Sequence, residues 1–301
     1  LKKSNGILCE SSRVRYAFIE RHMAEYSVTE LCAVLNVSRT GFYKWKKFGI
    51  SQHEHNDNDL LSRIKAIFEE YKGIYGSPRV HAELRDQGIC CSRKRVARLM
   101  SANGLRAKAA RKFKATTNSK HNYPVHPNLL EQNFVVDAPN KVWTADITYI
   151  ATGEGWLYLA VVLDIYSRKI VGWAMGERMT RHLVMSALTM AYWQRKPKPG
   201  LIHHSDRGSQ YASYDYQDML KDFGMVCSMS GVGNCYDNAI TETVFHSLKM
   251  ELIFGTYFAT RVDAKSEIFT YIEELYNRKR KHSSLGYCSP VKFEQQYEMV
   301  A

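Results

Sequence analysis

The segments KVWTADITYI (141–150) and GWLYLAVVLDIYSRKIVGWAM (155–175) decide the fold. In the first, polar and apolar residues alternate, which is the pattern of a β-strand. The second is apolar for long enough to form two strands, and Tyr166-Ser167-Arg168 supplies a turn between them. The sequence therefore predicts three consecutive strands with short connections.

Helices and strands alternate after these three strands. The pattern predicts a helix over 180–196, a strand over 200–206, a helix over 213–224, a strand over 225–230 and a helix over 234–252. The full order is β-β-β-α-β-α-β-α. A meander followed by alternating helices and strands predicts a mixed sheet flanked by helices. This is the order of a ribonuclease H-like α/β core.

The N-terminal region is predicted to be all-α. In SVTELCAVLNVSRTGFYKWKK (27–47), two short helices flank a tight turn near Asn36, and Ser38 is placed to cap the second helix. This is the layout of a helix-turn-helix whose second helix approaches DNA.

A second helical region follows the first. We expect a helix over 59–72 and another that Ser77 caps, with Pro78 in its first position. CCSRKRVARLMSANG (90–104) then repeats the capped, basic helix, with Ser92 as the cap. Two successive helical hairpins of this kind favour DNA contact over a merely solvated basic face.

The positive charge lies entirely in the first part of the chain. The 301 residues carry a net charge of +12, but residues 1–120 hold 24 Lys and Arg against 11 Asp and Glu, whereas residues 121–301 hold 18 against 19. One basic region on a chain that is otherwise neutral indicates a polyanionic partner, most simply nucleic acid. The alternative is that the charge serves only solubility.

Membrane and secretory segments are not evident. No apolar run reaches the roughly 18 residues of a membrane span, and the first residues lack a secretory pattern. The seven cysteines include no C-x-x-C pair, which argues against both a disulfide framework and a cysteine zinc site. A reducing, cytoplasmic setting fits these observations best.

Changes in composition divide the chain into five parts. Residues 107–140 are basic and polar with little periodicity, which is typical of a linker. The predicted parts are a first helix-turn-helix region (1–54), a second helical domain (55–106), the linker (107–140), the catalytic core (141–260) and a C-terminal helical, basic extension (261–301).

Three carboxylates occupy unusual places in the predicted core. Asp146 lies in the middle of an apolar strand, where a carboxylate is costly to bury unless it is hydrogen-bonded or binds a metal. Asp206 closes the strand over 200–206, at an edge where α/β sheets gather their active sites. Glu242 lies on the helix over 234–252. The intervals between them are 59 and 35 residues.

The helix that carries Glu242 has one polar face. Asn238, Glu242, His246 and Lys249 fall nearly above one another at 100° per residue, while a separate apolar stripe would face the core. For such a helix taken alone, the simplest interpretation is a solvated face. With the other two carboxylates, the interpretation that we favour is a catalytic face.

Four motifs of this sequence resemble a known family. They are WTADITY (143–149), HSDRGSQY (204–211), CYDNAITETVFHSLKMEL (235–252) and YNRKRKHSSLGYCSP (276–290). Together they resemble the catalytic, B-frame product of bacterial insertion-sequence transposases with a D-D-(35)-E triad, which are relatives of retroviral integrases. The resemblance runs from about residue 15 to residue 297.

This resemblance implies metal-dependent DNA chemistry at the three carboxylates. The expected cofactors are two Mg²⁺ ions, for which Mn²⁺ can substitute, about 3.5–4 Å apart. Asp146 would bridge the ions, and Asp206 and Glu242 would each complete one. Water would first cut next to the element's end, and the freed 3′-hydroxyl would then attack another phosphodiester.

The resemblance also implies partners. These are double-stranded DNA (the element's terminal repeats and the target) and further copies of the chain that bridge the two ends. The first residues, LKKSNGILCESS, resemble the tail of the upstream frame's product. We therefore expect that product to act as a fusion or a partner that supplies end recognition and dimerisation.

Several residues are candidates for contact with DNA. Lys249 is placed to hold a phosphate, Asn238 to orient Glu242 or touch DNA, and Gln210 to contact DNA or shape its loop. The full set of candidates is Lys249, Asn238, Gln210, Arg39, Lys44, Arg93, Lys94, Arg95, Arg278, Arg280 and His282.

Other polar residues have simpler interpretations. Asp164 ends a strand and is expected to be structural, and Asp237 is expected to cap the helix of Glu242. His203 and His204 lack the second pair that a zinc site requires, so we expect His204 to pack or to hydrogen-bond beside Asp206.

Two alternative functions remain open. One is a catalytically silent DNA-binding accessory protein or inhibitor of transposition, and the intact triad argues against it. The other is a plain ribonuclease H-like nuclease, which would not need two helical hairpins that read DNA.

Overall fold

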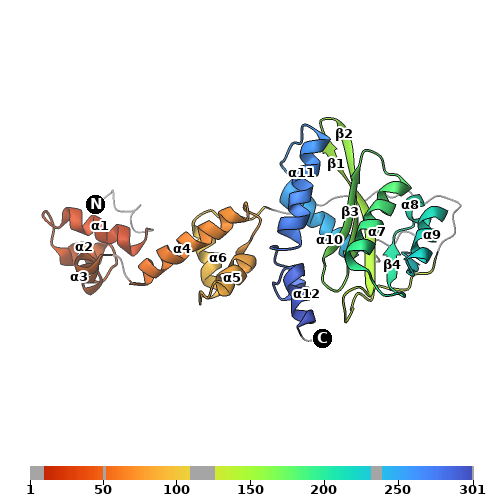
Figure 1. Cartoon of the computed structure of the whole chain (residues 1–301). Coiled ribbons are helices and arrows are strands. Elements are labelled where there is room, and N and C mark those ends of the chain that lie inside the picture. Colours follow the sequence, from red (N-terminus) through yellow and green to blue (C-terminus); the bar gives the residue numbers. More distant parts are fainter. Residues whose placement is uncertain (1–9, 50–51, 109–125, 232–238, 300–301) are drawn as a thin grey trace. The chain divides into compact units, whose positions relative to one another are not determined.

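The computed structural model of this chain describes residues 10–49, 52–108, 126–231 and 239–299. The chain divides into two compact units, Leu1–Arg106 and Ala107–Ala301. The described part of the first unit is helical, and the second unit holds a β-sheet between helices (Figure 1).

The first three helices form a small core of their own. They are α1 (Ser12–His22), α2 (Val28–Val34) and α3 (Arg39–Phe48). Ile19, Cys32, Leu35 and Phe42 are buried between them. The Ser38 hydroxyl accepts a hydrogen bond from the Gly41 N–H at 2.9 Å, so the predicted cap of the second helix is confirmed.

The next three helices are α4 (Gln52–Glu70), α5 (Ser77–Asp86) and α6 (Arg93–Ala102). The α4 helix starts seven residues before the predicted boundary at 59, because its polar first turns are compatible with an exposed helix; Gln52 bonds Asn56 one turn on. Ser92 caps α6 as predicted.

The predicted cap at Ser77 is wrong by one residue. The extended residue before α5 is Gly76, and Ser77 is already helical. Pro78 therefore falls within the first turn, where its missing N–H has no helical partner to lose.

The second unit contains a five-stranded mixed sheet in the order β3-β2-β1-β4-β5. Its strands are β1 (Val142–Thr152), β2 (Gly155–Asp164), β3 (Ile170–Gly176), β4 (Ile202–Ser205) and β5 (Val226–Met229). The first three are antiparallel neighbours, whereas β4 pairs parallel to β1 and to β5. The predicted order of strands and helices is confirmed, with one short additional helix, α8 (Ser209–Ala212).

Helices cover both faces of the sheet (Figure 1). One face packs against α7 (Arg181–Arg195), α8 and α9 (Tyr214–Asp222). The other packs against α10 (Ala239–Leu248), α11 (Arg261–Thr270) and two π-helical turns, η2 (Lys249–Ile253) and η3 (Tyr271–Tyr276). Alternate residues of β1 and β2 feed the two cores, which is why these strands are apolar on both faces.

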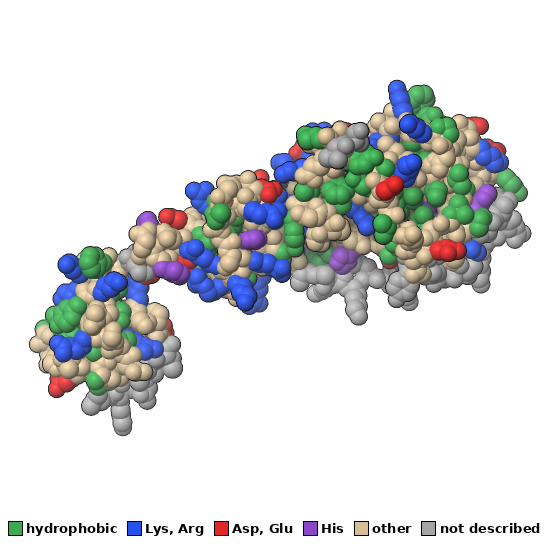
Figure 2. Space-filling model, turned by 90° about the horizontal axis from the view of Figure 1, so that it is seen from below, with side chains coloured by type: hydrophobic (Ala, Val, Ile, Leu, Met, Phe, Trp, Pro, Cys, Tyr) green, Lys and Arg blue, Asp and Glu red, His purple; other side chains and the backbone are tan. Residues whose placement is uncertain are grey.

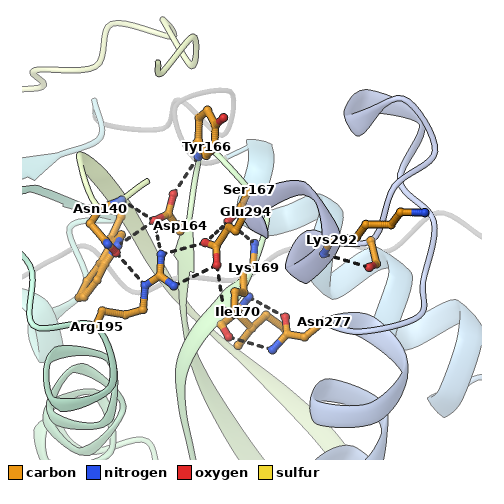
Figure 3. A network of polar contacts seen from close by, with 12 residues as sticks. Asn140, Asp164, Tyr166, Ser167, Lys169, Ile170, Arg195, Asn277, Lys292 and Glu294 are labelled. Carbon is orange, nitrogen blue, oxygen red and sulfur yellow. Dashed lines mark hydrogen bonds and ion pairs between the residues drawn. The ribbon is translucent and has the colours of Figure 1, made fainter. Parts of the chain in front are cut away.

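The C-terminal segment is held to the sheet by a polar network (Figure 3). This C-terminal segment contains the short helix η4 (Ser283–Leu285) and α12 (Pro290–Glu298). Glu294 of α12 accepts two hydrogen bonds from Arg195, at 3.0 and 2.8 Å, and one each from Lys169 and Ser167. The Asn277 amide bonds both the N–H and the C=O of Ile170 at 3.0 Å.

Asp164 belongs to the same network and is structural, as expected. Its carboxylate accepts the N–H groups of Asn140 at 2.7 Å and Tyr166 at 2.9 Å, which fixes the turn between β2 and β3 (Figure 3). Burial raises the pKa of Asp164 to about 6, although these N–H groups and nearby Arg195 favour its ionised form.

Many Lys and Arg side chains gather on the described part of the helical unit (Figure 2). Among the described helices of the whole chain, none has the length and apolar character needed to cross a membrane.

Candidate active site

The register of two parallel strands brings Asp146 and Asp206 to one edge of the sheet. The pairing of β1 with β4 ends at Ala145 and Ser205, which face each other. Asp146 and Asp206 are the next residues on their strands, so both carboxylates start from the same level, at the point where the two strands diverge. Both residues are half-buried.

A tight turn holds the Asp206 carboxylate. Its Oδ1 accepts the Gly208 N–H at 2.9 Å. A Cβ on residue 208 would lie 3.0 Å from both this oxygen and the Gln210 Oε1, so the turn has little room for a side chain. The Gln210 amide in turn donates to the Met179 carbonyl at 3.2 Å. Gln210 thus shapes the loop that carries Asp206, which is one of its two predicted roles.

A buried hydrogen bond between two threonines sets the position of Glu242. The Thr241 hydroxyl on α10 donates to the Thr144 hydroxyl on β1 at 2.7 Å, and neither side chain is exposed. Ile240, Val244 and Leu248 bury the same side of α10 against the sheet. Glu242, which follows Thr241, is half-buried beside β1.

The three carboxylates and one lysine act on each other electrostatically. Burial raises the pKa of Asp146 well above its usual value, and the negative charges of Asp206 and Glu242 raise it further. The Ile147 N–H, at 2.7 Å from Asp146 Oδ1, and the charge of Lys249 oppose this rise. Burial also raises the pKa of Glu242. Perturbed pKa values of this kind concentrate at functional sites.

Lys249 lies where the helix changes its pitch. The α-helical bonds of α10 give way to the π turn η2 at Lys249, whose carbonyl accepts the Phe254 N–H at 2.7 Å. The ammonium group stands over the Tyr149 ring, 5.3 Å from its centre. The predicted continuous α-helix over 234–252 therefore ends at Leu248. Single π turns occur often at functional sites.

The donor set is chemically suited to a hard cation. Three carboxylates, with their mutual repulsion, are the ligands that Mg²⁺ and Mn²⁺ prefer. Among the described residues, however, no group of three His, Cys, Asp or Glu side chains lies close enough together to hold a metal ion.

A residue of the π turn forms a buried ion pair, and the residues of this buried cluster include two that were predicted to contact DNA. Arg280 bonds Glu251 of η2 at 2.6 to 3.0 Å and Ser247 at 2.8 Å. Arg280 is 5% exposed, and His282 beside it is 8% exposed. Side chains enclosed in this way are not available to a DNA strand, so the expectation that Arg280 and His282 contact DNA is not supported. Arg278 is exposed.

In the helical unit, most of the predicted DNA contacts are exposed. Arg39 and Lys44 are exposed on α3, where they line an open surface depression of about 600 Å³. Arg93 and Lys94 are exposed at the start of α6. Arg95 is the exception, since its Nε pairs with Asp57 of α4 at 2.6 Å. The structure therefore gives Arg95 an internal role in place of the predicted DNA contact.

The other predicted residues of the core are accounted for as follows. His204 bonds the Ser228 hydroxyl at 2.9 Å, and His203 bonds the Tyr216 hydroxyl at 3.1 Å, so both are packed and hydrogen-bonded. Asn238 and Asp237 lie outside the described residues, and their predicted roles stay predictions.

Sequence reasoning missed the residues that support the site. Thr144 lies two positions before Asp146, on the same face of β1, and this buried polar residue was an available signal for its bond to α10. No comparable signal marks Glu251 in the sequence, because an acidic residue near the end of a helix is ordinarily expected to be exposed to solvent.

Comparison with known families now defines the class of this protein. Residues 136–235 and 242–297 match two families that are both described as integrase core domain, and residues 55–113 match the HTH-like domain. The mixed sheet, with Asp146 and Asp206 at one of its edges, agrees with these matches. The protein is an integrase-type polynucleotidyl transferase.

Individual relatives narrow this class. The chain is 47% identical over 283 residues to transposase InsF for insertion sequence IS3A of Escherichia coli K12, which covers 93% of this chain and 98% of that protein. It is 49% identical over 271 residues to the uncharacterized 31 kDa protein of insertion element IS600 of Shigella sonnei, which covers 90% and 100%. The chain belongs to the insertion-sequence transposases related to InsF of IS3.

A solved structure is also similar, at a greater distance. The intasome of simian T-cell lymphotropic virus, in complex with the PP2A regulatory subunit B56 gamma, matches with 16% sequence identity and a TM-score of 0.44. The match covers 71% of this chain and 69% of that one.

Proposed function

We propose that this transposase nicks the ends of its own insertion sequence and joins the freed 3′-hydroxyl to another DNA strand. The observation that carries the proposal is that the register of β1 and β4 brings Asp146 and Asp206 to one sheet edge, while Glu242 lies on the helix that packs against β1. The charges of Asp206 and Glu242 both raise the pKa of Asp146.

The residues at this edge fit two divalent cations in chemical type. Asp146 would contact both ions, and Asp206 and Glu242 would each complete one. When bound, such ions neutralise charge on the phosphate and activate the attacking and leaving oxygens.

The chain's own groups position the reaction. The turn at Gly208 restrains Asp206, and the bond between Thr144 and Thr241 restrains the helix that carries Glu242. The Lys249 ammonium, which is electrostatically coupled to Asp146, is placed to hold a phosphate of the reacting strand. Phosphoryl transfer depends mainly on such positioning and on charge neutralisation.

DNA recognition falls to the helical unit in this proposal. Arg39, Lys44, Arg93 and Lys94 are exposed on two separate helices of that basic region. They would hold the terminal repeats through phosphate contacts. We further propose that two or more copies bridge both ends, and that the product of the upstream frame joins them.

The proposal is tested with labelled DNA that carries the element's end. Cleavage and joining are measured with Mg²⁺, Mn²⁺ or EDTA for the wild type and for Glu242→Gln. The matched control is Glu267→Gln, which replaces an exposed carboxylate on α11. We expect metal-dependent nicking and joining that only Glu242→Gln abolishes, while DNA binding persists in all three. Binding without metal-dependent chemistry, even with the upstream product supplied, would instead indicate the silent accessory protein.

A further inference from the structure

Two exposed aromatic side chains stand together on the hairpin of β1 and β2. Tyr149 is 39% exposed and Trp156 is 50% exposed. Their ring centres are 5.0 Å apart with the planes at 85°, so the pair leaves ring surface open to solvent. The register explains the contact: Tyr149 faces Tyr158, Ala151 faces Trp156, and the diagonal pair shares one face of the sheet.

This aromatic pair is linked to the catalytic carboxylates through Lys249, which contacts the Tyr149 ring and is electrostatically coupled to Asp146 on the other face of β1. The pairing of β4 with β1 stops at Ala145, so from Asp146 onward the described sheet has no strand on that side of β1. Lys249 comes from the opposite face of the sheet, and its ammonium reaches the Tyr149 ring at 5.3 Å. Tyr149, Trp156 and Lys249 thus form one aromatic and cationic surface beside this open edge. We call this three-residue surface the edge platform.

The spacing suits a nucleotide within a few steps of the reacting phosphate. Tyr149 follows Asp146 by three residues, which is about 10 Å along a strand. A duplex strand advances about 3.4 Å per base, so this span corresponds to about three base steps, and to fewer in an extended single strand.

We propose that the edge platform stacks an unpaired base of the DNA strand beside the phosphate that is cut. This inference rests on the proposed function, because it deepens the same site. Every base has a π-face, and stacking on aromatic rings together with a cation binds unpaired bases with little dependence on sequence. The Lys249 charge selects a polyanionic strand as the occupant over an apolar protein segment.

The platform would hold one strand apart from its partner at the place of cutting. A base that stacks on Trp156 is removed from the duplex, and its phosphate is then drawn toward the Lys249 ammonium. DNA that is already single-stranded at that point avoids the unpairing cost, so it should bind more tightly than a fully paired duplex.

The test uses the full chain with Glu242→Gln, in EDTA, so that the DNA is not cut. The probes are element-end duplexes, either fully paired or with a few unpaired nucleotides at the cleavage point, one of them 2-aminopurine. The parent protein carries Glu242→Gln alone, and three variants of it also carry Trp156→Ala, Trp156→Phe or Trp193→Ala. Trp193 is the matched control, because it is 63% exposed and lies in the last turn of α7, toward the other end of the sheet.

We expect quenching of 2-aminopurine and about tenfold tighter binding of the unpaired probe, with both effects retained by Trp156→Phe and Trp193→Ala and lost in Trp156→Ala. Equal quenching in Trp156→Ala and the parent protein overturns the proposal, as does equal affinity of the parent for both probes. Cleavage by the wild type is measured in parallel. Quenching that depends on Trp156, in a chain that never cuts, would support the platform and reject only the proposed function.

Discussion

Arg280 and Glu251 form a buried ion pair directly beneath the π turn that begins at Lys249. Their side chains are 6% and 8% exposed, and the guanidinium donates to both carboxylate oxygens. The Tyr271 hydroxyl donates to the same carboxylate at 2.8 Å. The pair therefore joins the end of the catalytic helix to the C-terminal segment.

We predict that Arg280→Met destabilises the second unit by about 3–5 kcal/mol, because it leaves the Glu251 charge buried without its partner. The double variant Glu251→Met, Arg280→Met should lose less than this single variant, since no unpaired charge remains. Urea unfolding of the full chain measures both. Arg278→Met, two residues away and exposed, should stay within about 0.5 kcal/mol of the wild type. A loss as small for Arg280→Met would contradict the prediction.

The different outcomes for Arg280 and Asp146 show how far the sequence alone can lead. Asp146 could be found because a carboxylate inside an apolar strand is anomalous within its own segment. The order of strands and helices could be found for the same reason, since the alternation of β1 and the apolar run of β2 are local patterns. The register that places Asp146 beside Asp206 then follows from the parallel pairing of β1 and β4.

Arg280 was misjudged because its environment is set elsewhere in the chain. Within residues 278–281, four successive basic residues look like a solvated run. Burial of Arg280 depends on Glu251, 29 residues upstream, and on a π turn that no periodicity announces. The same holds for Arg95, whose partner Asp57 lies on another helix.

We predict that the bond between Thr144 and Thr241 contributes to both stability and catalysis. Thr241→Val leaves the buried Thr144 hydroxyl without this partner, which should cost about 1–3 kcal/mol. It should also lower the rate of strand joining, because the neighbouring Glu242 is no longer fixed. Thr243→Val is the matched control, since its exposed hydroxyl bonds the Ala239 carbonyl of its own helix. Equal joining rates for the two variants would rule out a positioning role.

We predict an acid-sensitive contact between α4 and α6. The hydrogen bond from Arg98, and then that from Arg95, lower the pKa of Asp57 below its ordinary 3.8, against the effect of desolvation. A lowered folded-state pKa means that the stabilisation is present above pH 3.8 and is lost as the pH falls through the folded-state pKa. Amide exchange of α4 and α6 peptides in the intact chain, corrected for intrinsic rates, should show this loss below about pH 4. Asp57→Asn should be less protected at neutral pH and should lack the acid step; an unchanged acid step would assign it to another group.

We predict that neighbouring basic residues of α6 differ in their effect on DNA binding. Arg93 and Lys94 are exposed, so each alanine variant should lower the slope of log affinity against log salt by about 0.9, the effect of one lost phosphate contact. Arg95→Ala should leave that slope nearly unchanged while it weakens the fold, because its Nε is bonded to Asp57 at 2.6 Å. Titrations of an element-end duplex at several salt concentrations give the slopes, and thermal unfolding gives the stability. If Arg95→Ala reduced the slope as much as Arg93→Ala in a fully folded protein, the internal role assigned to Arg95 would be wrong.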